Sequence, residues 1–342
     1  MIYWWLVPTV VLVSLILTAV LRRYALARSI LDVPNSRSSH SMPTPRGGGV
    51  AIVIAFLLVL PVLAWAHLVA LPLLVGIGGA GAIVAIIGFM DDHGHIAARW
   101  RLLGHFFAAA WALFWLGGMP PVSLLGLSVN LGWLGHFLAA IYLVWMLNLY
   151  NFMDGIDGIA SVEAISACLG ACLIYYLNGF ESHIWIPSML ALAVTGFLFW
   201  NFPPARIFMG DAGSGFLGIV LGVISIQAAL IAPHLLWTWL ILLGVFIVDA
   251  TFTLIRRLLR GDKVYEAHRS HAYQFASRRY RKHLPVTIAV AAINLGWLLP
   301  IALCVSYFNL DGALGLIIAY VPLVVLAVKF RAGELEIKSS PH

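Results

Sequence analysis

Long apolar runs alternate with short polar connections along this chain. Eleven runs are long enough, or nearly long enough, to cross a bilayer as helices. Their approximate limits are 3–21, 48–67, 70–90, 102–119, 132–149, 160–178, 184–201, 213–231, 234–255, 284–306 and 312–329. The pattern predicts an all-α polytopic integral membrane protein with about eleven transmembrane helices.

Composition and charge strengthen this interpretation and orient the chain. With 62% hydrophobic and 10% charged residues over 342 positions, a soluble globular protein is excluded. All 20 Lys and Arg residues fall in connections that follow alternate apolar runs, beginning with Arg22 and Arg23. Basic residues mark the cytoplasmic side, so we expect the N-terminus outside and the C-terminus in the cytoplasm. External connections are short, which predicts a single transmembrane domain over 1–342.

The cysteines suggest no chemistry. Cys168, Cys172 and Cys304 all lie in apolar runs, where unpaired buried thiols are the usual state. Cys168 and Cys172 are one helical turn apart, but two thiols without further ligands make a poor metal site.

The stretch from Asn148 to Gly158 is the predicted working centre. Two carboxamides and two carboxylates recur there at three-residue intervals: Asn148, Asn151, Asp154 and Asp157. In a continuous helix, steps of three drift by about 60° each and would spread these side chains apart. A helix that ends near Asn151 and continues into a glycine-rich turn would let them converge. Oxygen ligands of this kind suit Mg²⁺ and a phosphate-bearing ligand, although a polar loop that caps two helices is the alternative.

The first cytoplasmic connection ends in three glycines before an apolar run. Its prolines stiffen it, and the glycines at 47–49 would let backbone N–H groups approach an anion, or let helices pack closely. Together with Arg37, His40 and Arg46, they favour a phosphate-binding role.

Two other connections carry acids at the membrane boundary. Asp91 and Asp92 are adjacent, which is costly unless they hold a cation or a proton; two solvated capping acids are the alternative. The same connection ends in Arg99 and Arg101. Asp211 follows Phe208-Met-Gly at the start of another apolar run, where an N-cap is the usual role of an isolated Asp.

The long basic connection 256–283 contains the motif His268-Arg269-Ser-His271. Much of its charge is expected to satisfy topology and anionic head groups. Arginine forks and histidines also suit phosphate oxygens, so the motif is a candidate ligand site. We expect Asp249, near the end of the preceding run, to pair with Arg256 or Arg257.

All these polar groups are predicted to lie on one membrane face. This indicates a soluble anionic substrate and a metal at the cytosolic boundary, in a site built from connections 22–47, 91–101, 150–159, 202–212 and 256–283. A transporter is disfavoured because transporters place essential ionisable residues near the midplane.

Five motifs, taken in their order along the chain, resemble those of a known enzyme family. They are Pro-Thr-Pro-Arg-Gly-Gly-Gly, Asp-Asp, Asn-x-x-Asn-x-x-Asp-Gly-x-Asp-Gly, Phe-Met-Gly-Asp-x-Gly-Ser and a His-rich last loop. The chain resembles the polyprenyl-phosphate N-acetylhexosamine-1-phosphate transferases, which share a fold with the phospho-MurNAc-pentapeptide translocases. The His-Arg-Ser-His-Ala-Tyr motif is similar to the branch that initiates O-antigen and related surface glycans; the translocases have adjacent histidines there. CDP-alcohol phosphotransferases and intramembrane prenyltransferases are disfavoured, because their acid spacings are missing.

The resemblance implies a residue for each task. Asn151 and Asp211 would bind Mg²⁺, with Mn²⁺ as a substitute, and Asp157, Asn201 and Phe208 would contact uridine. Arg101 stands where relatives often have a diphosphate-binding lysine. His268, Arg269 and His271 would hold the sugar-phosphate end, and Arg46 and His40 are further candidates for substrate binding. The predicted catalytic acids are Asp91, Asp92 and Asp154, and either Asp91 or Asp92 would orient or deprotonate the lipid phosphate.

The implied reaction is attack of undecaprenyl phosphate on the β-phosphorus of a UDP-N-acetyl sugar, with loss of UMP. We favour single displacement, because the acceptor is itself a competent nucleophile. The implied location is the bacterial inner membrane, in contact with the lipid bilayer and with no nucleic-acid partner, and a homodimer is left open. The alternatives are a peptidoglycan-type translocase and a transporter of lipid-linked sugars.

Overall fold

The computed structural model describes residues 3–34, 42–94, 96–263 and 268–335. Helices account for most of these residues. Their bounds are α1 Leu6–Ala27, α2 Val50–Trp65, α3 Leu71–His93, α4 Ala98–Leu116, α5 Gly132–Met153, α6 Ile159–Leu177, α7 Trp185–Asn201, α8 Asp211–Ile231, α9 His234–Leu242, α10 Gly244–Leu259, α11 Ala272–Tyr280, α12 Leu284–Ile293, α13 Leu299–Tyr307 and α14 Gly312–Lys329. Single turns add η1 at Glu181–His183 and a π-type turn, η2, at Asn294–Leu298.

In the part of the chain that the structure describes, strands are confined to two short hairpins. Strand β1 (Leu31–Asp32) pairs antiparallel with β2 (Thr44–Pro45), with Leu31 opposite Pro45. Strand β3 (Val122–Leu124) pairs with β4 (Leu127–Val129) in the connection between α4 and α5. The chain is therefore an all-α membrane protein, as predicted, but the sequence pattern did not predict the two small hairpins.

Every predicted apolar run contains helix, but fewer than eleven meet the requirements for a span. Among the described residues, eight helical segments are long and apolar enough to cross a membrane, or nine if α9 and α10 count as one bent span. Helix α2 has only 16 residues, and the first turn of α4 contains Arg99 and Arg101. The predicted runs at 48–67 and 102–119 are therefore helical but are not among the helices that meet the requirements for a span. The number eleven and the topology stay predictions.

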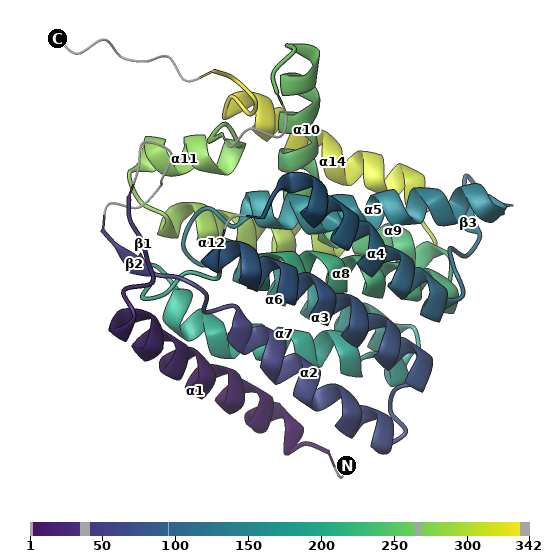
Figure 1. Ribbon diagram of the computed structural model, residues 1–342. Helices are drawn as coiled ribbons and strands as arrows, with labels where there is room; N and C mark the ends of the chain where they lie inside the picture. The colour runs from purple at the N-terminus through teal and green to yellow at the C-terminus, as the bar shows by residue number, and fades with distance from the viewer. Residues whose placement is uncertain (1–2, 35–41, 95, 264–267, 336–342) are drawn as a thin grey trace.

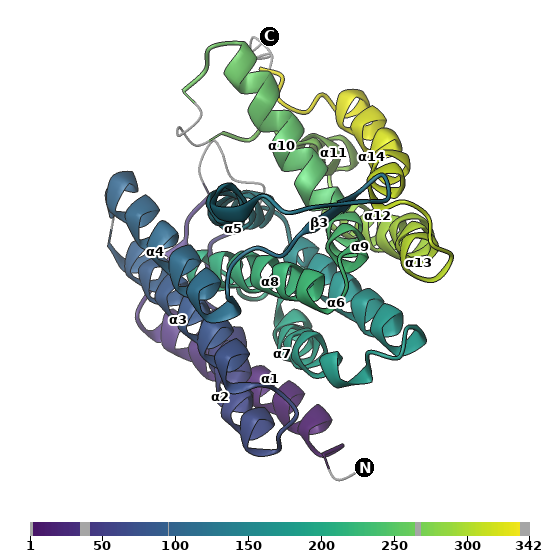
Figure 2. The ribbon, with the colours of Figure 1, turned by 90° about the vertical axis from the view of Figure 1, so that its right-hand side faces the viewer.

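Helix α8 is the centre of the bundle. It packs against α3, α5 and α9 (Figure 2), and 83% of the most apolar stretch of the helix is buried inside the protein. Glycines on α8 permit this: a Cβ at Gly218 would lie 2.5 Å from the Met146 carbonyl oxygen of α5, and one at Gly213 would lie 2.6 Å from the Gly49 Cα. The N-terminus of α8 is thereby held among several other elements.

Two spans are irregular. Helices α9 and α10 meet at an angle of 75°, and α10 points away from the other helices in Figure 1. The span from α12 to α13 contains the π-type turn, whose first residue, Asn294, donates from Nδ2 to Glu163 Oε2 and to Ser166 Oγ at 2.7 Å each. The bond to Glu163 Oε2 gives a buried polar atom of α6 a hydrogen-bond partner.

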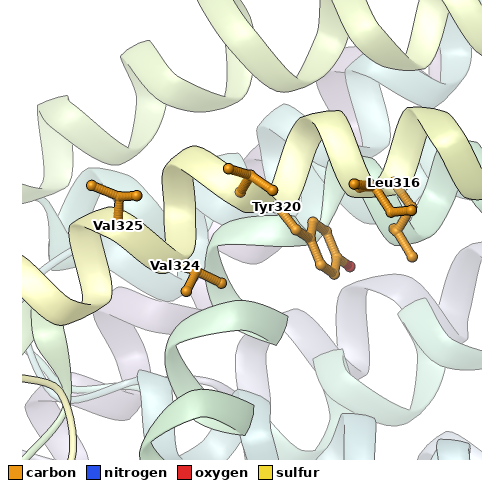
Figure 3. A pocket seen from close by; sticks show the side chains of 6 residues that line it. Leu316, Tyr320, Val324 and Val325 are labelled. Atoms are coloured by element: carbon orange, nitrogen blue, oxygen red, sulfur yellow. The ribbon is translucent and has the colours of Figure 1, made fainter.

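An apolar pocket on α14 lies away from the predicted site. It has a volume of about 350 Å³ and is lined by Leu316, Ile317, Tyr320, Val321, Val324 and Val325 (Figure 3). The hydroxyl of Tyr320 donates to the Leu240 carbonyl oxygen of α9 at 2.8 Å, so its polar atom is already satisfied. None of the predicted site residues that the structure describes lines this pocket.

Candidate active site

The segment that precedes α2 lies beside the segment that precedes α8. Phe208 N donates to Pro45 O at 2.8 Å, Gly48 N to Phe208 O at 2.9 Å and Gly49 N to Met209 O at 2.8 Å. The N–H groups of Gly48 and Gly49 are therefore used within the chain, and the expectation that these two groups approach an anion is wrong. The glycines instead allow close packing, since a Cβ at Gly49 would lie 2.5 Å from the Gly213 Cα.

Asp92 caps the N-terminus of α8 from the end of α3. Asp92 Oδ1 accepts from the Asp211 backbone N at 3.2 Å, and Oδ2 accepts from the Ala212 N at 3.4 Å. Helix N-termini leave N–H groups without intrahelical partners, so a carboxylate is stabilised there. Asp211 is the first residue of α8 and follows Gly210, whose φ is +77°. The expected N-cap role of Asp211 is thus wrong, and its carboxylate is left for other contacts.

Arg46 joins these two acids. Its Nη2 lies 2.6 Å from Asp92 Oδ1 and 2.7 Å from Asp211 Oδ1. Burial alone would lower the pKa of Arg46, but Asp211 and Asp92 raise it, so the guanidinium stays charged. Arginine is suited to such contacts, because its planar fork presents several donors.

Arg101 makes a second arginine–acid pair at the same edge. It is paired with Asp91, which also accepts from the Ile96 backbone N at 2.9 Å, and its Nη1 lies 3.9 Å from Asp211 Oδ2. The two arginines therefore flank Asp211. The structure thus brings together three connections that are far apart in the sequence.

The register of α5 against α8 brings Asn151 and Asp154 toward the same point. A Cβ at Gly222 would touch Leu143, one at Gly218 would touch Met146, and one at Gly215 would approach Leu147. The helices are antiparallel, so continuing the register places the C-terminal end of α5 beside the N-terminal end of α8. Helix α5 ends at Met153 and a turn follows to Gly158, whose φ is +75°, as the glycine-rich motif predicted.

Electrostatics support this convergence. Burial, and then the neighbouring Asp211 carboxylate, raise the pKa of Asp154 well above its ordinary value, and Asp157 and Asp92 add to the effect. A carboxylate raises the pKa of Asp154 in this way only when it lies close to it. A cation among them would relieve the repulsion.

The donor set fits Mg²⁺ bound together with a substrate diphosphate. In the part of the chain that the structure describes, no three His, Cys, Asp or Glu residues form a metal-binding group. Mg²⁺ does not need one, because it usually keeps several waters and binds one or two carboxylates plus substrate phosphates. Asp211 can supply a carboxylate oxygen and Asn151 an amide oxygen.

A pocket borders this cluster on the side of Asp157. It has a volume of about 480 Å³, and its lining includes Asp157, Phe208 and the turn Arg281–Lys282–His283. Asp157 Oδ2 accepts from the Ala205 N at 3.0 Å, and Oδ1 lies 3.0 Å from His283 Nδ1. The structure thus places two of the predicted uridine contacts in one cavity. Basic side chains also line it, as suits an anionic ligand.

Asn201, the third predicted uridine contact, lies elsewhere. Its side chain is buried, and Oδ1 accepts from the Gly158 N at 2.9 Å while Nδ2 donates to Ile207 O at 3.0 Å. Asn201 therefore links the turn after α5 to the segment before α8. Its contacts hold the pocket in shape, and it is not among the residues that line the pocket.

The histidine motif lies beside the turn after α5. His271 caps α11, and the Tyr273 hydroxyl donates to the Phe152 carbonyl oxygen at 2.9 Å. Burial, together with His271 and Arg257, lowers the pKa of His268 to about 3, so its ring is neutral. A neutral His268 binds a phosphate only as a hydrogen-bond donor.

The expected pairing of Asp249 with Arg256 or Arg257 is replaced by a different role. Asp249 accepts from the Ala272 N at 2.9 Å and the Tyr273 N at 3.0 Å, so it caps α11 and fixes the motif. Arg256 contacts Glu334 at 3.0 Å and Arg257 contacts Asp262 at 3.4 Å. Of the other predicted residues, Arg269 accepts a bond at its carbonyl oxygen from Arg278, and His40 lies outside the described residues.

Sequence reasoning missed His283. It is one of several basic residues in the long connection, and no motif marks it. The one signal in the sequence is that His283 comes just before an apolar run. A polar residue near the start of a helix can face a neighbouring loop.

Acids and arginines gathered at the start of α8 suit a membrane enzyme that acts on a phosphate-bearing ligand, and sequence comparison identifies the family. Residues 74–229 match glycosyl transferase family 4. The probable undecaprenyl-phosphate N-acetylglucosaminyl 1-phosphate transferase of Bacillus subtilis is 32% identical over 276 residues, which cover 77% of this chain and 74% of that protein. The chain therefore belongs to glycosyl transferase family 4.

Two further relatives widen the comparison. The undecaprenyl-phosphate alpha-N-acetylglucosaminyl 1-phosphate transferase of Thermotoga maritima is 28% identical over 280 residues, or 82% of this chain and 84% of that protein. The phospho-N-acetylmuramoyl-pentapeptide-transferase of Streptococcus pneumoniae serotype 2 is 28% identical over 199 residues, or 54% of this chain and 59% of that protein.

Proposed function

We propose that this protein transfers N-acetylglucosamine 1-phosphate from UDP-N-acetylglucosamine to undecaprenyl phosphate and releases UMP. The observation that carries the proposal is the convergence of Arg46, Asp92 and Asp211 at the start of α8, beside the pocket of Asp157 and Phe208. Support also comes from the Bacillus subtilis and Thermotoga maritima relatives, whose names state this activity.

The chemistry needs charge neutralisation more than it needs a base. The acceptor phosphate is largely a dianion near neutral pH, so the main barrier is repulsion between two phosphate groups. Asn151 and Asp211 would hold Mg²⁺, which when bound would supply positive charge against the negative charge that develops on the diphosphate. Arg46 and Arg101 would add positive charge at the same edge.

The roles of the adjacent acids follow from their contacts. The Asp92 side chain is 4% exposed and is engaged by Arg46 and by two backbone N–H groups of α8. Asp91 is engaged by Arg101. These contacts favour an orienting role over deprotonation of the lipid phosphate. Asp154 remains a proposed catalytic acid beside Asp211, and single displacement remains the proposed course.

The histidine motif completes the proposed substrate site. His268, Arg269 and His271 would hold the sugar-phosphate end, and His40 would contribute from the first connection. We further propose eleven spans with the N-terminus outside and the C-terminus in the cytoplasm of a bacterial inner membrane. The pathway proposed is the initiation of O-antigen or a related surface glycan.

A panel of radiolabelled nucleotide sugars tests the proposal. Purified protein would be incubated with undecaprenyl phosphate, Mg²⁺ and UDP-N-acetylglucosamine, the UDP derivatives of N-acetylfucosamine and N-acetylquinovosamine, or UDP-MurNAc-pentapeptide. We expect UMP release and a labelled lipid with UDP-N-acetylglucosamine. A preference for the muramyl peptide would favour the peptidoglycan-type enzyme, and sugar-lipid translocation without UMP release would favour a transporter.

A further inference from the structure

The turn between α11 and α12 is anchored on the loop that follows α5. Helix α11 ends at Tyr280, and Arg281 takes a φ of +54° before α12 begins at Leu284. Thr287, in the first turn of α12, donates from Oγ1 to the Asp157 carbonyl oxygen at 2.8 Å. This bond fixes the position of the turn relative to Asp157 across 130 residues of sequence.

His283 in this turn faces the Asp157 carboxylate. Its Nδ1 lies 3.0 Å from Asp157 Oδ1, and the Asp157 backbone N–H points at the same nitrogen at the longer distance of 3.3 Å. The contact with the carboxylate is the shorter of the two and involves a charged group, and two acceptor atoms at 3.0 Å would repel each other. We therefore assign the ring proton to Nδ1, which then donates to Oδ1 instead of accepting from the backbone N–H. Both partners are largely buried, with side-chain exposures of 15% and 12%. A hydrogen bond to a charged group in such surroundings is stronger than one between neutral groups.

The opposite oxygen of the same carboxylate is also held. Asp157 Oδ2 accepts from the Ala205 backbone N at 3.0 Å, so each oxygen has one donor from the protein. A carboxylate oxygen has a second acceptor position, so both oxygens can still accept from a ligand. The carboxylate is thus fixed in orientation at the wall of a cavity of about 480 Å³, which Phe208 and His283 also line.

We propose that His283 is a positioning residue for nucleotide recognition: it holds the Asp157 carboxylate so that this group accepts a hydrogen bond from the N3–H of a uracil base. This inference rests on the proposed function, which makes a uridine diphosphate sugar the donor. Uracil presents a donor at N3, whereas cytosine presents an acceptor there. A carboxylate that is held in place therefore favours uracil over cytosine. A carboxylate that is misplaced would lose much of its selectivity between the two bases.

Two variants of similar shape separate this role from simple packing. In His283→Asn, the side-chain NH₂ takes the place of Nδ1–H; in His283→Gln, the NH₂ lies farther out, near the position of Nε2. His283→Ala removes the donor, and Arg279→Ala, at an exposed position of α11 outside the pocket lining, is the matched control. Binding of UMP and of CMP to each purified protein would be measured by calorimetry, followed by steady-state kinetics with UDP-N-acetylglucosamine.

We expect UMP affinity to fall about tenfold in His283→Ala and His283→Gln and to recover in His283→Asn. The preference for UMP over CMP should fall with it. KM for the nucleotide sugar should rise by a similar factor while kcat changes by less than about twofold, since the contact is shared by ground and transition states. Arg279→Ala should bind like wild type.

Wild-type UMP affinity in both His283→Ala and His283→Gln would overturn the inference. So would equal losses in His283→Asn and His283→Gln, because packing alone would then explain them. Wild-type protein that binds UMP but transfers no phosphosugar would contradict the proposed reaction and leave the His283 result to stand. Absence of any UMP binding by wild type would overturn both.

Discussion

Arg46 donates to Asp211 at the N-terminal end of α8, with Nη2 2.7 Å from Oδ1 although 165 residues separate the two in the sequence. The same nitrogen contacts Asp92 at 2.6 Å, so one guanidinium links the first connection, the end of α3 and the start of α8. This arrangement allows several carboxylates to lie together at the membrane boundary, where unpaired charges are costly.

Replacement of Arg46 should therefore impair both stability and turnover. In Arg46→Gln, the carboxylates of Asp92 and Asp211 lose their shared counter-charge, so we expect a lower melting temperature and a kcat reduced at least about tenfold. Arg46→Lys should retain part of the activity, because it keeps the charge but not the planar fork. Arg28→Gln, at an exposed position of the same connection, is the control. Wild-type turnover in Arg46→Gln would contradict the role assigned here.

Asp211 should determine metal binding. We expect chelation to abolish activity and added Mg²⁺ or Mn²⁺ to restore it, because the diphosphate needs a bridging cation. In Asp211→Ala, the number of Mn²⁺ ions bound in the presence of UDP, measured by electron paramagnetic resonance, should fall while the far-ultraviolet circular dichroism is unchanged. Full turnover in excess chelator would exclude the assignment.

Asp157 and Asp92 should affect different kinetic constants. Asp157→Ala removes a wall of the nucleotide pocket, so it should chiefly raise KM for the nucleotide sugar. Asp92→Asn keeps the shape but turns an acceptor into a donor that faces the Ala212 N–H, so α8 should shift and kcat should fall. Steady-state kinetics with each substrate varied in turn make the comparison. The opposite pattern would mean that the two roles are reversed.

The helical architecture could be predicted because its determinants are local. An apolar run of about 20 residues can satisfy its backbone within a bilayer only as a helix, and each predicted run contains helix. The 75° break between α9 and α10 could not be predicted. It falls at Leu243 and Gly244, where the sequence has no proline, and the apolar run continues through both positions. Its cause lies in packing against other helices.

The site could be predicted from the sequence where a motif determines the local conformation of the chain. The turn after α5 follows from glycines and acids that are close in sequence. The partners of the acids could not be predicted from the sequence, because they lie in distant segments of the chain. Examples are the contacts Arg46–Asp92, Asp249–Ala272 and Asp157–His283. Asp249 was misassigned for this reason: nearby arginines suggested a partner, whereas the N-terminus of α11 offered two free N–H groups.

The neutral His268 should make stability depend on pH. Its folded-state pKa is lowered to about 3, below the ordinary value of 6.5, so the unfolded chain binds the proton more readily. This contribution to stability is present above about pH 6.5 and is lost progressively as the pH falls below it. Thermal unfolding at about pH 7.5 and about pH 5 should show a smaller loss of melting temperature in His268→Asn than in wild type. An equal or larger loss in the variant would contradict this.

The proposed topology can be tested by labelling. Ser182 and Arg279 are both exposed, the first between α6 and α7 and the second on α11. Single cysteines at these positions, in a chain with Cys168, Cys172 and Cys304 replaced, should react from opposite sides of the membrane. Reaction of both with an impermeant reagent in intact cells would overturn the topology, and with it the cytoplasmic placement of the site.

The most direct test of the account follows the phosphate itself. Wild-type protein would receive UDP-N-acetylglucosamine labelled with ³²P at the β-phosphorus, together with undecaprenyl phosphate and Mg²⁺. The account predicts that the label moves into the lipid fraction with release of one unlabelled UMP for each labelled lipid. Recovery of the label in UDP, with only the sugar on the lipid, would contradict phosphosugar transfer.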